Sequence, residues 1–379
     1  MLRYWTAGES HGKGILAFID GFPAGVALDK PMIDRELKRR QSGYGRGGRQ
    51  AIESDEVDVL TGVYQGQTTG APIVLWVKNR DVRIDTLPDL EAFRPGHGDL
   101  PGSLKFRNGI RPTLERASAR ETAAKVAAGG LAKSFLSLLG INVAAYVVSI
   151  GPISLAAKDV HRMSIAEIVR KRDESELFSL NPELDFKAKE QIDRCREEGD
   201  TLGGIIEVRC DGVPFGLGTH AQWDLKLDGR LAQALMAVQA IKGVEIGLGF
   251  ESARLPGSQV HDPIFYDKQQ GFTRSSNNAG GIEAGMTNSE PILLRAAMKP
   301  IPTLRKPFPS VNFETLEAVE SSYERSDVCA VPAASVVLEA VTALEIAKAL
   351  TEQFGVHLDD YHCDTPGKRK SLVVWLSPK

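Results

Sequence analysis

A long stretch of small residues between Thr113 and Leu139 constrains the fold more than any other feature of the sequence. Its alanines include Ala117, Ala119, Ala123, Ala124, Ala127 and Ala128. Alanine has the highest intrinsic helix propensity, and small side chains let a helix approach its neighbours closely. The stretch therefore predicts a long helix in the interior of the protein. Gly129 and Gly130 indicate either a kink in this helix or a tight crossing with another one.

Apolar runs predict the strands that accompany this helix. They cover residues 14–19, 71–77, 142–150, 203–213 and 291–298. Further helices are predicted over 33–40, 228–241 and about 332–353. The first of these has its start signal at Asp29, two residues before a proline. Strands grouped between a few long helices are typical of layered α+β folds rather than of regular βαβ alternation.

The segments between these elements carry weaker patterns. Surface loops are predicted at 79–93, 153–162 and 255–280. Residues 160–200 are rich in charged side chains and predict a peripheral helical excursion, placed around 155–200. No repeat of fixed period and no low-complexity linker divides the sequence. We therefore expect residues 1–379 to form a single domain with this excursion at its edge.

The overall composition limits the classes of function. The chain has 379 residues, 42% of them hydrophobic, and a net charge of only −3, whereas a protein dominated by nucleic-acid binding is usually more basic. The four cysteines are not spaced as zinc ligands, which predicts reduced thiols and no metal site. No signal-peptide pattern opens the sequence, and no apolar run is long enough to span a bilayer. These features predict a cytoplasmic protein that binds neither membranes nor nucleic acids.

The first candidate site residue is His11, within Gly-Glu-Ser-His-Gly at residues 8–12. A histidine among small residues can meet a ligand closely and can donate or accept a proton near neutral pH. The alternative is a turn histidine that is hydrogen-bonded to the backbone.

The second candidate is a basic stretch from Arg35 to Arg49, with Glu36 as its one acidic residue. Its cations are Arg35, Lys38, Arg39, Arg40, Arg46 and Arg49. Residues 43–48 formally match GxGxxG, but they follow a helix-like segment rather than a strand, so we reject a dinucleotide-binding fold. A flexible glycine loop that carries Arg46 over an anion accounts better for the pattern, because the guanidinium binds phosphate or carboxylate bidentately. The alternative is a solvated basic face.

The third candidate runs from Arg94 to Arg120 and includes His97. Its cations are Arg94, Lys105, Arg107, Arg111, Arg116 and Arg120. Arg116 and Ser118 lie near the start of the alanine-rich helix, where backbone donors and the helix dipole favour anions. Pairing of Arg116 and Arg120 with Glu115 and Glu121 is an alternative that is compatible with this role.

The fourth candidate is built from three C-terminal segments. They are the small-residue loop 277–286, Lys299–Thr303 after a strand, and Arg325-Ser326-Asp327 before a helix. Backbone amides, two cations and a carboxylate of this kind could hold a phosphorylated planar cofactor. The sequence contains no GxSxG, P-loop or HExxH motif, and we treat His362-Cys363-Asp364 as part of a tail.

Taken in order, these segments resemble the chorismate synthase family. The matching motifs are residues 6–12, 39–46, 94–99, 115–122, 242–245, 278–282 and 325–327. The resemblance covers nearly the whole chain and implies a layered β-α-β sandwich, with long central helices packed between antiparallel sheets, in a homotetramer. Two departures are Gly98, where alanine is common, and Leu100-Pro101-Gly102, where a tyrosine-containing turn is usual. They remove no charged group.

The resemblance also implies an activity. It is the conversion of 5-enolpyruvylshikimate 3-phosphate to chorismate and phosphate, an anti-1,4-elimination by a carbon–oxygen lyase acting on phosphates (EC 4.2.3.5). This is the last common step of the shikimate pathway to the aromatic amino acids. The family requires reduced FMN. By analogy, His11 protonates the leaving phosphate, His97 stabilises or protonates the reduced flavin, and Asp327 lies near the reactive flavin nitrogen.

Binding residues follow by matching motifs. The implied FMN contacts are Arg116, Ala117, Ser118, Gln239, Ala240, Ala284, Lys299, Pro300, Ile301, Pro302, Thr303 and Arg325. Substrate or NADP contacts are Ser10, Arg40 and Arg46, and charge favours the substrate for the two arginines. NADPH would act as an indirect reductant, because no distinct insertion points to a built-in flavin reductase.

Two other classes of protein compete with this interpretation. A flavin-binding or phosphate-binding protein without catalysis would use the same basic loops, but binding alone needs no histidine that titrates near neutral pH. A nucleic-acid-binding module ranks third, because the sequence has no platform of aromatic and basic residues.

Overall fold

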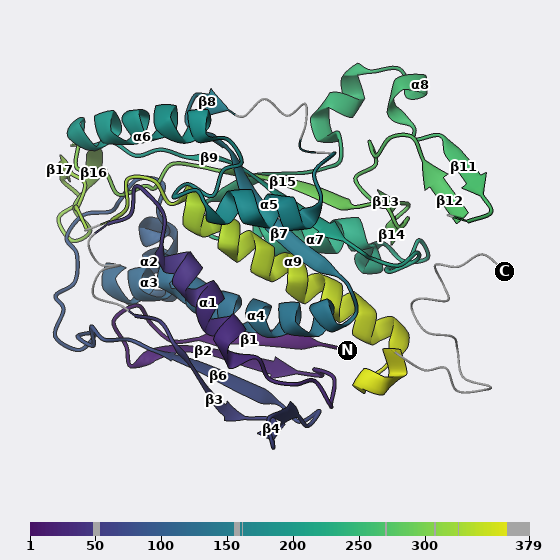
Figure 1. Cartoon of the computed structure of the whole chain (residues 1–379). Coiled ribbons are helices and arrows are strands. Elements are labelled where there is room, and N and C mark those ends of the chain that lie inside the picture. Colours follow the sequence, from purple (N-terminus) through teal and green to yellow (C-terminus); the bar gives the residue numbers. More distant parts are fainter. Residues whose placement is uncertain are drawn as a thin grey trace.

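The computed structural model describes residues 1–47, 54–154, 160, 162–269, 271–306, 308–324 and 326–361. Two antiparallel sheets enclose a layer of long helices (Figure 1). This arrangement confirms the predicted α+β class and the layered β-α-β sandwich.

The first sheet has four strands in the order β1-β2-β6-β3 and lies at the bottom of Figure 1. Their bounds are β1 Arg3–Ala7, β2 Gly14–Asp20, β6 Ile73–Lys78 and β3 Val57–Thr61. Burial alternates along β6, with Ile73, Leu75 and Val77 facing the helices. On the outer face, Trp5 and Phe18 are exposed and pack edge to face. Within the described residues, helices therefore cover one face of this sheet and leave Trp5 and Phe18 exposed on the other.

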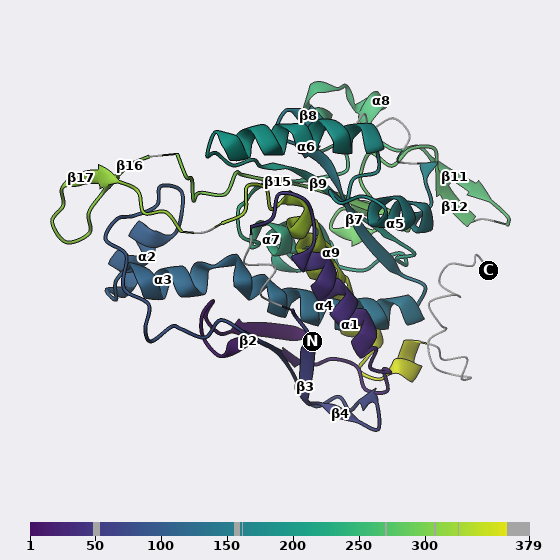
Figure 2. The ribbon, with the colours of Figure 1, turned by 60° about the vertical axis from the view of Figure 1, so that its left-hand side comes forward.

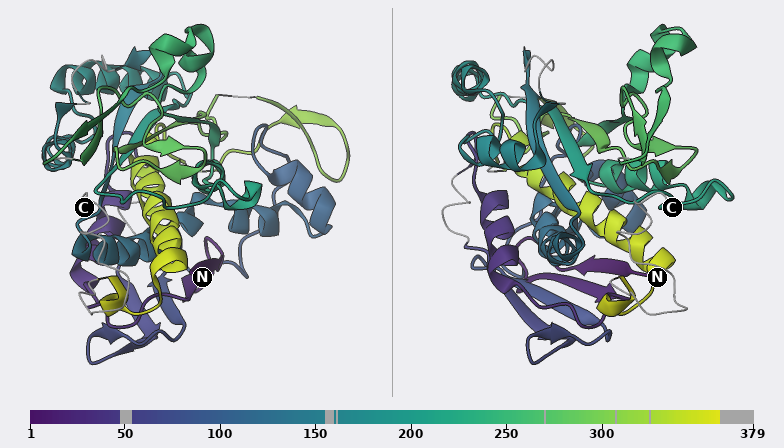
Figure 3. Two further views of the ribbon diagram at one scale, coloured as in Figure 1. Left: turned by 90° about the vertical axis from the view of Figure 1, so that its right-hand side faces the viewer. Right: turned by 45° about the vertical axis from the view of Figure 1, so that its right-hand side comes forward.

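The second sheet has five strands in the order β10-β15-β9-β7-β8. Their bounds are β10 Ile241–Ile246, β15 Ile292–Met298, β9 Gly204–Asp211, β7 Asn142–Ile150 and β8 Ile153–Ser154. The long strands β7 and β9 are buried along most of their length: α9 packs against both strands, and α5 packs against β7 as well. Figure 3 shows both sheets with the helices between them.

The central layer contains α1 Lys30–Gln41, α4 Thr122–Leu138, α7 Leu227–Met236 and α9 Val331–Phe354. Asp29 caps α1, where its Oδ1 accepts a hydrogen bond from the backbone N–H of Met32 at 2.9 Å. Gly129 marks a tight crossing, because a Cβ atom there would lie 2.3 Å from Cβ of Ala340 on α9. Of the two alternatives for the glycine pair, the close crossing is the one the structure supports.

The prediction of one continuous helix from about Thr113 to Leu139 is wrong in its first part. It is divided into α3 Ile110–Ala117, a 3-10 turn Ala119–Glu121, and α4. Ser118 has an extended backbone (ψ 142°), and its side chain accepts a hydrogen bond from the N–H of Arg120. Ser118-Ala119-Arg120-Glu121 is a capping-box pattern, so the sequence held a signal for this break.

Two further boundaries differ from prediction. The helix predicted over 228–241 ends at Met236, because the chain turns through Ala240, which has a left-handed φ of 67°, into β10. The loop predicted over 255–280 contains α8 Gly257–Val260 and a hairpin of β11 Ile264–Asp267 and β12 Gly271–Arg274. The apolar residues Ile264, Phe265, Tyr266 and Phe272 of these strands are exposed and do not alternate with polar ones, so no strand pattern distinguished the segment from a loop.

The remaining elements surround this frame. Helices α5 Ile165–Asp173 and α6 Pro182–Glu197 lie over the outer side of the second sheet, within the stretch predicted as a helical excursion. Helix α2 Asp99–Phe106 packs with α3, and the arm formed by β16 Pro309–Val311 and β17 Ala318–Glu320 lies beside them (Figure 2). Short pairs are β4 Val63–Tyr64 with β5 Gln67–Thr68, and β13 Ile282–Glu283 with β14 Met286–Thr287.

Candidate active site

A cavity of about 530 Å³ lies where segments distant in sequence meet. The turn after β1, the C-terminal end of α1, the α3–α4 junction and the segments that follow α7 and β15 form most of its wall, and the start of α9 completes it. The predicted site residues that line it are Ser10, His11, Arg40, Arg46, His97, Ala117, Ser118, Gln239, Ala240, Lys299, Ile301, Pro302, Thr303 and Asp327. Most of the segments singled out from the sequence therefore share one cavity.

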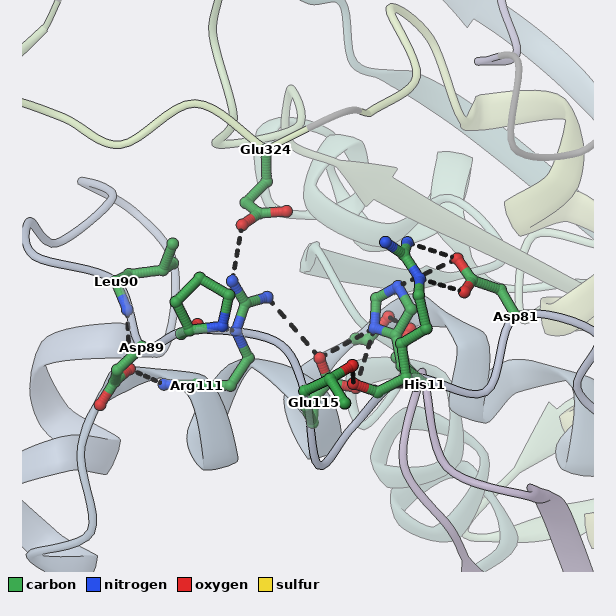
Figure 4. A network of polar contacts seen from close by, with 12 residues as sticks. His11, Asp81, Asp89, Leu90, Arg111, Glu115 and Glu324 are labelled. Carbon is green, nitrogen blue, oxygen red and sulfur yellow. Dashed lines mark hydrogen bonds and ion pairs between the residues drawn. The ribbon is translucent and has the colours of Figure 1, made fainter.

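His11 lies in the turn between β1 and β2 and is held by Glu115 of α3 (Figure 4). Its Nδ1 lies 2.9 Å from Oε1 of Glu115, and its backbone N–H donates to Oε2 at 2.8 Å. Burial opposes ionisation of Glu115, but these hydrogen bonds lower the pKa of its carboxyl group. The imidazole is therefore fixed by a buried carboxylate rather than by backbone groups alone.

His97 lies before α2, in a second group of the same kind. Its Nδ1 lies 2.5 Å from Oδ1 of Asp99, and Arg94 donates to the same carboxylate from Nε and Nη2 at 2.8 and 2.9 Å. Burial opposes ionisation of Asp99, but the hydrogen bonds from His97 and Arg94 hold the pKa of its carboxyl well below the usual range. Arg94 also donates to Thr303, which ties this group to the segment after β15.

Two arginines at the cavity share one buried carboxylate. Nη2 of Arg40 lies 2.6 Å from Asp55, and Nη1 of Arg120 lies 2.7 and 2.9 Å from its two oxygens. Burial, together with the neighbouring Arg120, lowers the pKa of the Arg40 guanidinium against the opposing effect of Asp55. Because two guanidinium groups share one carboxylate, the group of three side chains has a net positive charge, which favours binding of an anionic ligand.

Arg46 pairs with Asp327 across the cavity. Its Nη1 lies 2.6 Å from Oδ2 of Asp327, and the N–H of Gly47 donates to Oδ1 at 2.6 Å. The described part of the glycine loop is hydrogen-bonded to the segment before α9, because the carbonyl of Gly45 accepts from the N–H groups of Val328 and Cys329. Gly45 has a φ of 90°, and a Cβ there would lie 3.0 Å from Cβ of Cys329. The loop is therefore packed against the segment before α9.

The charges around the cavity favour an anion. Its lining cations are Arg40, Arg46, Arg94, Arg120, Lys242 and Lys299, and its lining carboxylates are Glu324 and Asp327. Burial, together with nearby Lys242, lowers the pKa of the Lys299 amine. Within the described residues, three buried polar atoms of the lining have no hydrogen-bond partner: Nε of Arg40, Nε of Arg46 and Oε1 of Gln239. Such atoms are costly unless a ligand satisfies them.

Some predicted residues lie elsewhere. Arg116 is not among the lining residues and donates instead to the backbone and hydroxyl oxygens of Thr6. Ala284 lies in the turn between β13 and β14. The neighbouring Gly285 accepts a hydrogen bond from the N–H of Leu227 at the start of α7, whereas the cavity is lined by residues that follow the end of α7. Pro300 is not among the lining residues, although both its neighbours are. Arg325, Arg49 and His362-Cys363-Asp364 lie outside the described residues.

Other residues of the site carried no signal in the sequence. Asn79 donates from Nδ2 to the carbonyls of Glu9, Ser10 and Gly12 at 3.0, 3.2 and 2.8 Å, and so shapes the turn that holds His11. Asp55 is one of four acidic residues between Glu53 and Asp58 in the sequence, and only the fold singles it out for this role. The described residues contain no cluster of three or more His, Cys, Asp or Glu side chains suited to a metal ion. None of the helices described is long and apolar enough to cross a membrane.

Comparison with known proteins decides the family. A family model described as chorismate synthase matches residues 2–351. The chain belongs to the chorismate synthase family. It is thereby a carbon–oxygen lyase acting on phosphates (EC 4.2.3.5), and the resemblance inferred from the motifs is confirmed.

Similar proteins extend over almost the entire chain. Chorismate synthase of Desulforamulus reducens is 53% identical over 368 residues, which cover 94% of this chain and 95% of the relative. That of Geobacter metallireducens is 51% identical over 375 residues, with the same coverage. A crystal structure of chorismate synthase superimposes with a TM-score of 0.79 at 44% identity, over 95% of this chain and 94% of that one. Fold and family therefore agree.

Proposed function

We propose that this chain converts 5-enolpyruvylshikimate 3-phosphate to chorismate and phosphate with reduced FMN. The observation that carries the proposal is one cavity lined by six cations and two histidines, each histidine held by a buried carboxylate. The reaction removes phosphate and a ring hydrogen from the two ends of an allylic system, without net redox change. It needs a site for several anions and a proton donor beside the leaving phosphate.

The basic residues meet the first requirement. The substrate carries one phosphate and two carboxylates, and arginine binds such groups bidentately. Arg40, Arg46 and Arg120 line the cavity, and the Nε atoms of Arg40 and Arg46, which have no hydrogen-bond partner among the described residues, add two donors for these anions. Charge neutralisation of the departing phosphate lowers the barrier to elimination. We assign Ser10, Arg40 and Arg46 to the substrate rather than to NADP.

The histidines meet the second requirement. We assign proton transfer to the leaving phosphate to Nε2 of His11, since its Nδ1 is engaged by Glu115. His97 is a second proton-handling group at the same cavity, and we assign it to the flavin side together with Asp327. Both imidazoles have a fixed orientation, which favours directed proton transfer.

The remaining lining residues fit a flavin. The volume lies within the range of about 300–1,000 Å³ typical of cofactor sites. Apolar lining residues from the start of α9 supply a surface for a planar ring, and Oε1 of Gln239 is a buried acceptor with no partner in the described chain. Ser118, Gln239, Ala240 and Lys299–Thr303 would hold FMN, while Arg116, Ala284 and Arg325 stay assigned to it by family resemblance alone. When bound, reduced FMN lends electron density to the allylic system of the substrate and recovers it.

Further aspects of the proposal rest on family membership. We propose that reduced flavin comes from an external source, with NADPH as an indirect reductant. We also propose a homotetramer, one domain over residues 1–379 with an edge excursion around 155–200, and a place in the cytoplasm on the shikimate pathway to aromatic amino acids.

The test is an anaerobic assay with chemically reduced FMN and 5-enolpyruvylshikimate 3-phosphate. Chorismate and phosphate should appear in equal amounts, and oxidised FMN should give neither. Absence of both products, despite binding of FMN in a fluorescence titration, would refute the proposal and favour a flavin-binding protein without this activity.

A further inference from the structure

His11 is held by an unusually complete set of contacts to one buried side chain. Glu115 has no exposed side-chain surface. Within the described residues, His11 makes the hydrogen bonds to its carboxylate, through the imidazole and through the backbone N–H. The carbonyl of Glu115 also accepts a hydrogen bond from the N–H of Ser10 at 3.0 Å. Side chain and backbone of one residue therefore anchor the whole turn.

The backbone of the turn around His11 is also held by hydrogen bonds, which restrict movement of the imidazole. Three of its carbonyls accept hydrogen bonds from the side chain of Asn79, and the carbonyl of His11 accepts from the N–H groups of Arg83 and Ile84. With the backbone held on both sides, the ring is confined to the position beside Glu115.

This contact decides where the neutral imidazole carries its proton. A carboxylate only accepts hydrogen bonds, so the nitrogen beside Glu115 must be the donor, which leaves the lone pair on Nε2. An imidazolium that gives up its Nε2 proton thus becomes the neutral form that Glu115 binds. The reverse tautomer would place a lone pair against the carboxylate.

The carboxylate of Asp81 faces Nε2 of His11 at ion-pair distance but forms no hydrogen bond with it. Asp81 lies 3.8 Å from Nε2 of His11, too far for a hydrogen bond. The carboxylate of Asp81 is bound instead by the guanidinium of Arg83, at 2.5 and 2.8 Å. On the other side, Arg111 lies 3.7 Å from Glu115 and 3.1 Å from Glu324 (Figure 4). Nε2 therefore remains available to a ligand in the cavity that His11 lines.

We infer that Glu115 is a positioning residue that fixes His11 as the Nδ1–H tautomer and so makes Nε2 the proton-donating atom. The inference rests on the proposed role of His11 in the elimination. Glu115 itself touches neither the substrate nor the reacting atoms, and it acts only through the imidazole.

The decisive variant is Glu115→Gln, which keeps the size of the side chain. An amide has one acceptor oxygen, so it cannot accept from both the ring and the backbone N–H of His11. If the oxygen stays with the backbone, the amide NH₂ faces Nδ1 and favours the wrong tautomer. We expect kcat to fall by about 10²–10⁴-fold, the range of general-acid catalysis, with little change in KM. Glu115→Asp retains a carboxylate and should restore part of the loss.

A spectroscopic readout separates positioning from a structural role. In ¹⁵N NMR of histidine-labelled protein with FMN, His11 should show the Nδ1–H pattern, assigned by its loss in His11→Ala. Glu115→Gln should lose this pattern, while the exposed Glu183→Gln on α6 should keep it and wild-type kcat. In a His11→Ala background, Glu115→Gln should lower kcat no further.

Two results would overturn the inference. One is an Nε2–H tautomer of His11 in the wild-type protein, and the other is wild-type kcat in a folded Glu115→Gln variant. Failure of the proposed function looks different, because the wild-type protein would then make no chorismate, whereas the NMR signals would still report the tautomer.

Discussion

Replacing Gly129 by alanine tests the close crossing of α4 and α9. The added Cβ would lie 2.3 Å from Cβ and 2.5 Å from Cα of Ala340, whereas ordinary carbon–carbon contacts are about 3.5–4.0 Å. The helices must separate by more than about 1 Å, and neither neighbour is a flexible side chain that could move aside.

The size of the effect follows from two opposing terms. Overpacking of a core costs about 1–3 kcal/mol, while replacing a helical glycine by alanine regains up to about 1 kcal/mol. Because the overlap with Ala340 exceeds about 1 Å, we place the overpacking cost at the upper end of this range and expect Gly129→Ala to lose about 1–2 kcal/mol of unfolding free energy. Since the first turns of both helices line the cavity, a shift at the crossing also displaces cavity walls.

Gly229→Ala is the matched control. Gly229 lies in α7, is exposed, and has no atom within 4 Å of an added Cβ, so only the gain in helix propensity remains. Urea unfolding followed by fluorescence should give a lower midpoint for Gly129→Ala and an equal or higher midpoint for Gly229→Ala than for the wild-type protein. A Gly129→Ala midpoint at or above the wild-type value would refute the argument.

Three further predictions concern the cavity. His11→Ala should keep FMN affinity in a fluorescence titration but lose at least about 100-fold in turnover, because the proton donor is removed. Arg46→Ala should raise the KM for substrate with a smaller effect on the unfolding midpoint, because a cationic contact to an anion is lost. Asp99 has a lowered pKa in the folded protein, so its stabilising contribution is present above the unfolded value of about 3.9 and is lost as pH falls below it. Asp99→Asn should therefore flatten the decline of the urea midpoint below pH 4.

Control variants at exposed positions, and the results that would contradict each prediction, are as follows. Exposed His220→Ala is the control for His11→Ala, and near wild-type turnover in the latter would contradict its role. Arg254→Ala, which removes an exposed arginine paired with Glu251, is the control for Arg46→Ala, and an unchanged KM there would count against substrate binding. An equally steep acid decline in Asp99→Asn would show that other carboxyl groups control it.

Long apolar and alanine-rich segments were predictable because their signal is local. The strands β2, β6, β7, β9 and β15 and the helices α1 and α9 follow from side-chain patterns within each segment. Short exposed pairs such as β11 with β12 were missed, since their strands gain stability from pairing rather than from a buried face. The break at Ser118 was missed although the sequence carried a capping signal, because the alanines on both sides favour one continuous helix.

The residues of the cavity were largely identifiable from the sequence, but their partners were not. His11, His97 and the arginines stand out because charged and titratable side chains among glycines are chemically conspicuous. Glu115 and Asp99 lie within quoted motifs without any sign that each would hold a histidine, and Asp55 had no sign at all. Hydrogen bonds of 2.5–3 Å depend on how loops and helices meet, which local patterns do not encode.

By itself, the sequence determined the chemical inventory, the family and the main elements of this protein, because these depend on residue types and short-range order. Only the tertiary structure decided which carboxylate orients His11, that Arg40 and Arg120 share Asp55, and that Gly45 is hydrogen-bonded to Val328 and Cys329. Contacts of this kind join residues far apart in the sequence; Gly47 and Asp327, for example, are 280 positions apart. Their geometry follows from the packing of two sheets around the helices, in which every neighbour limits the position of the next.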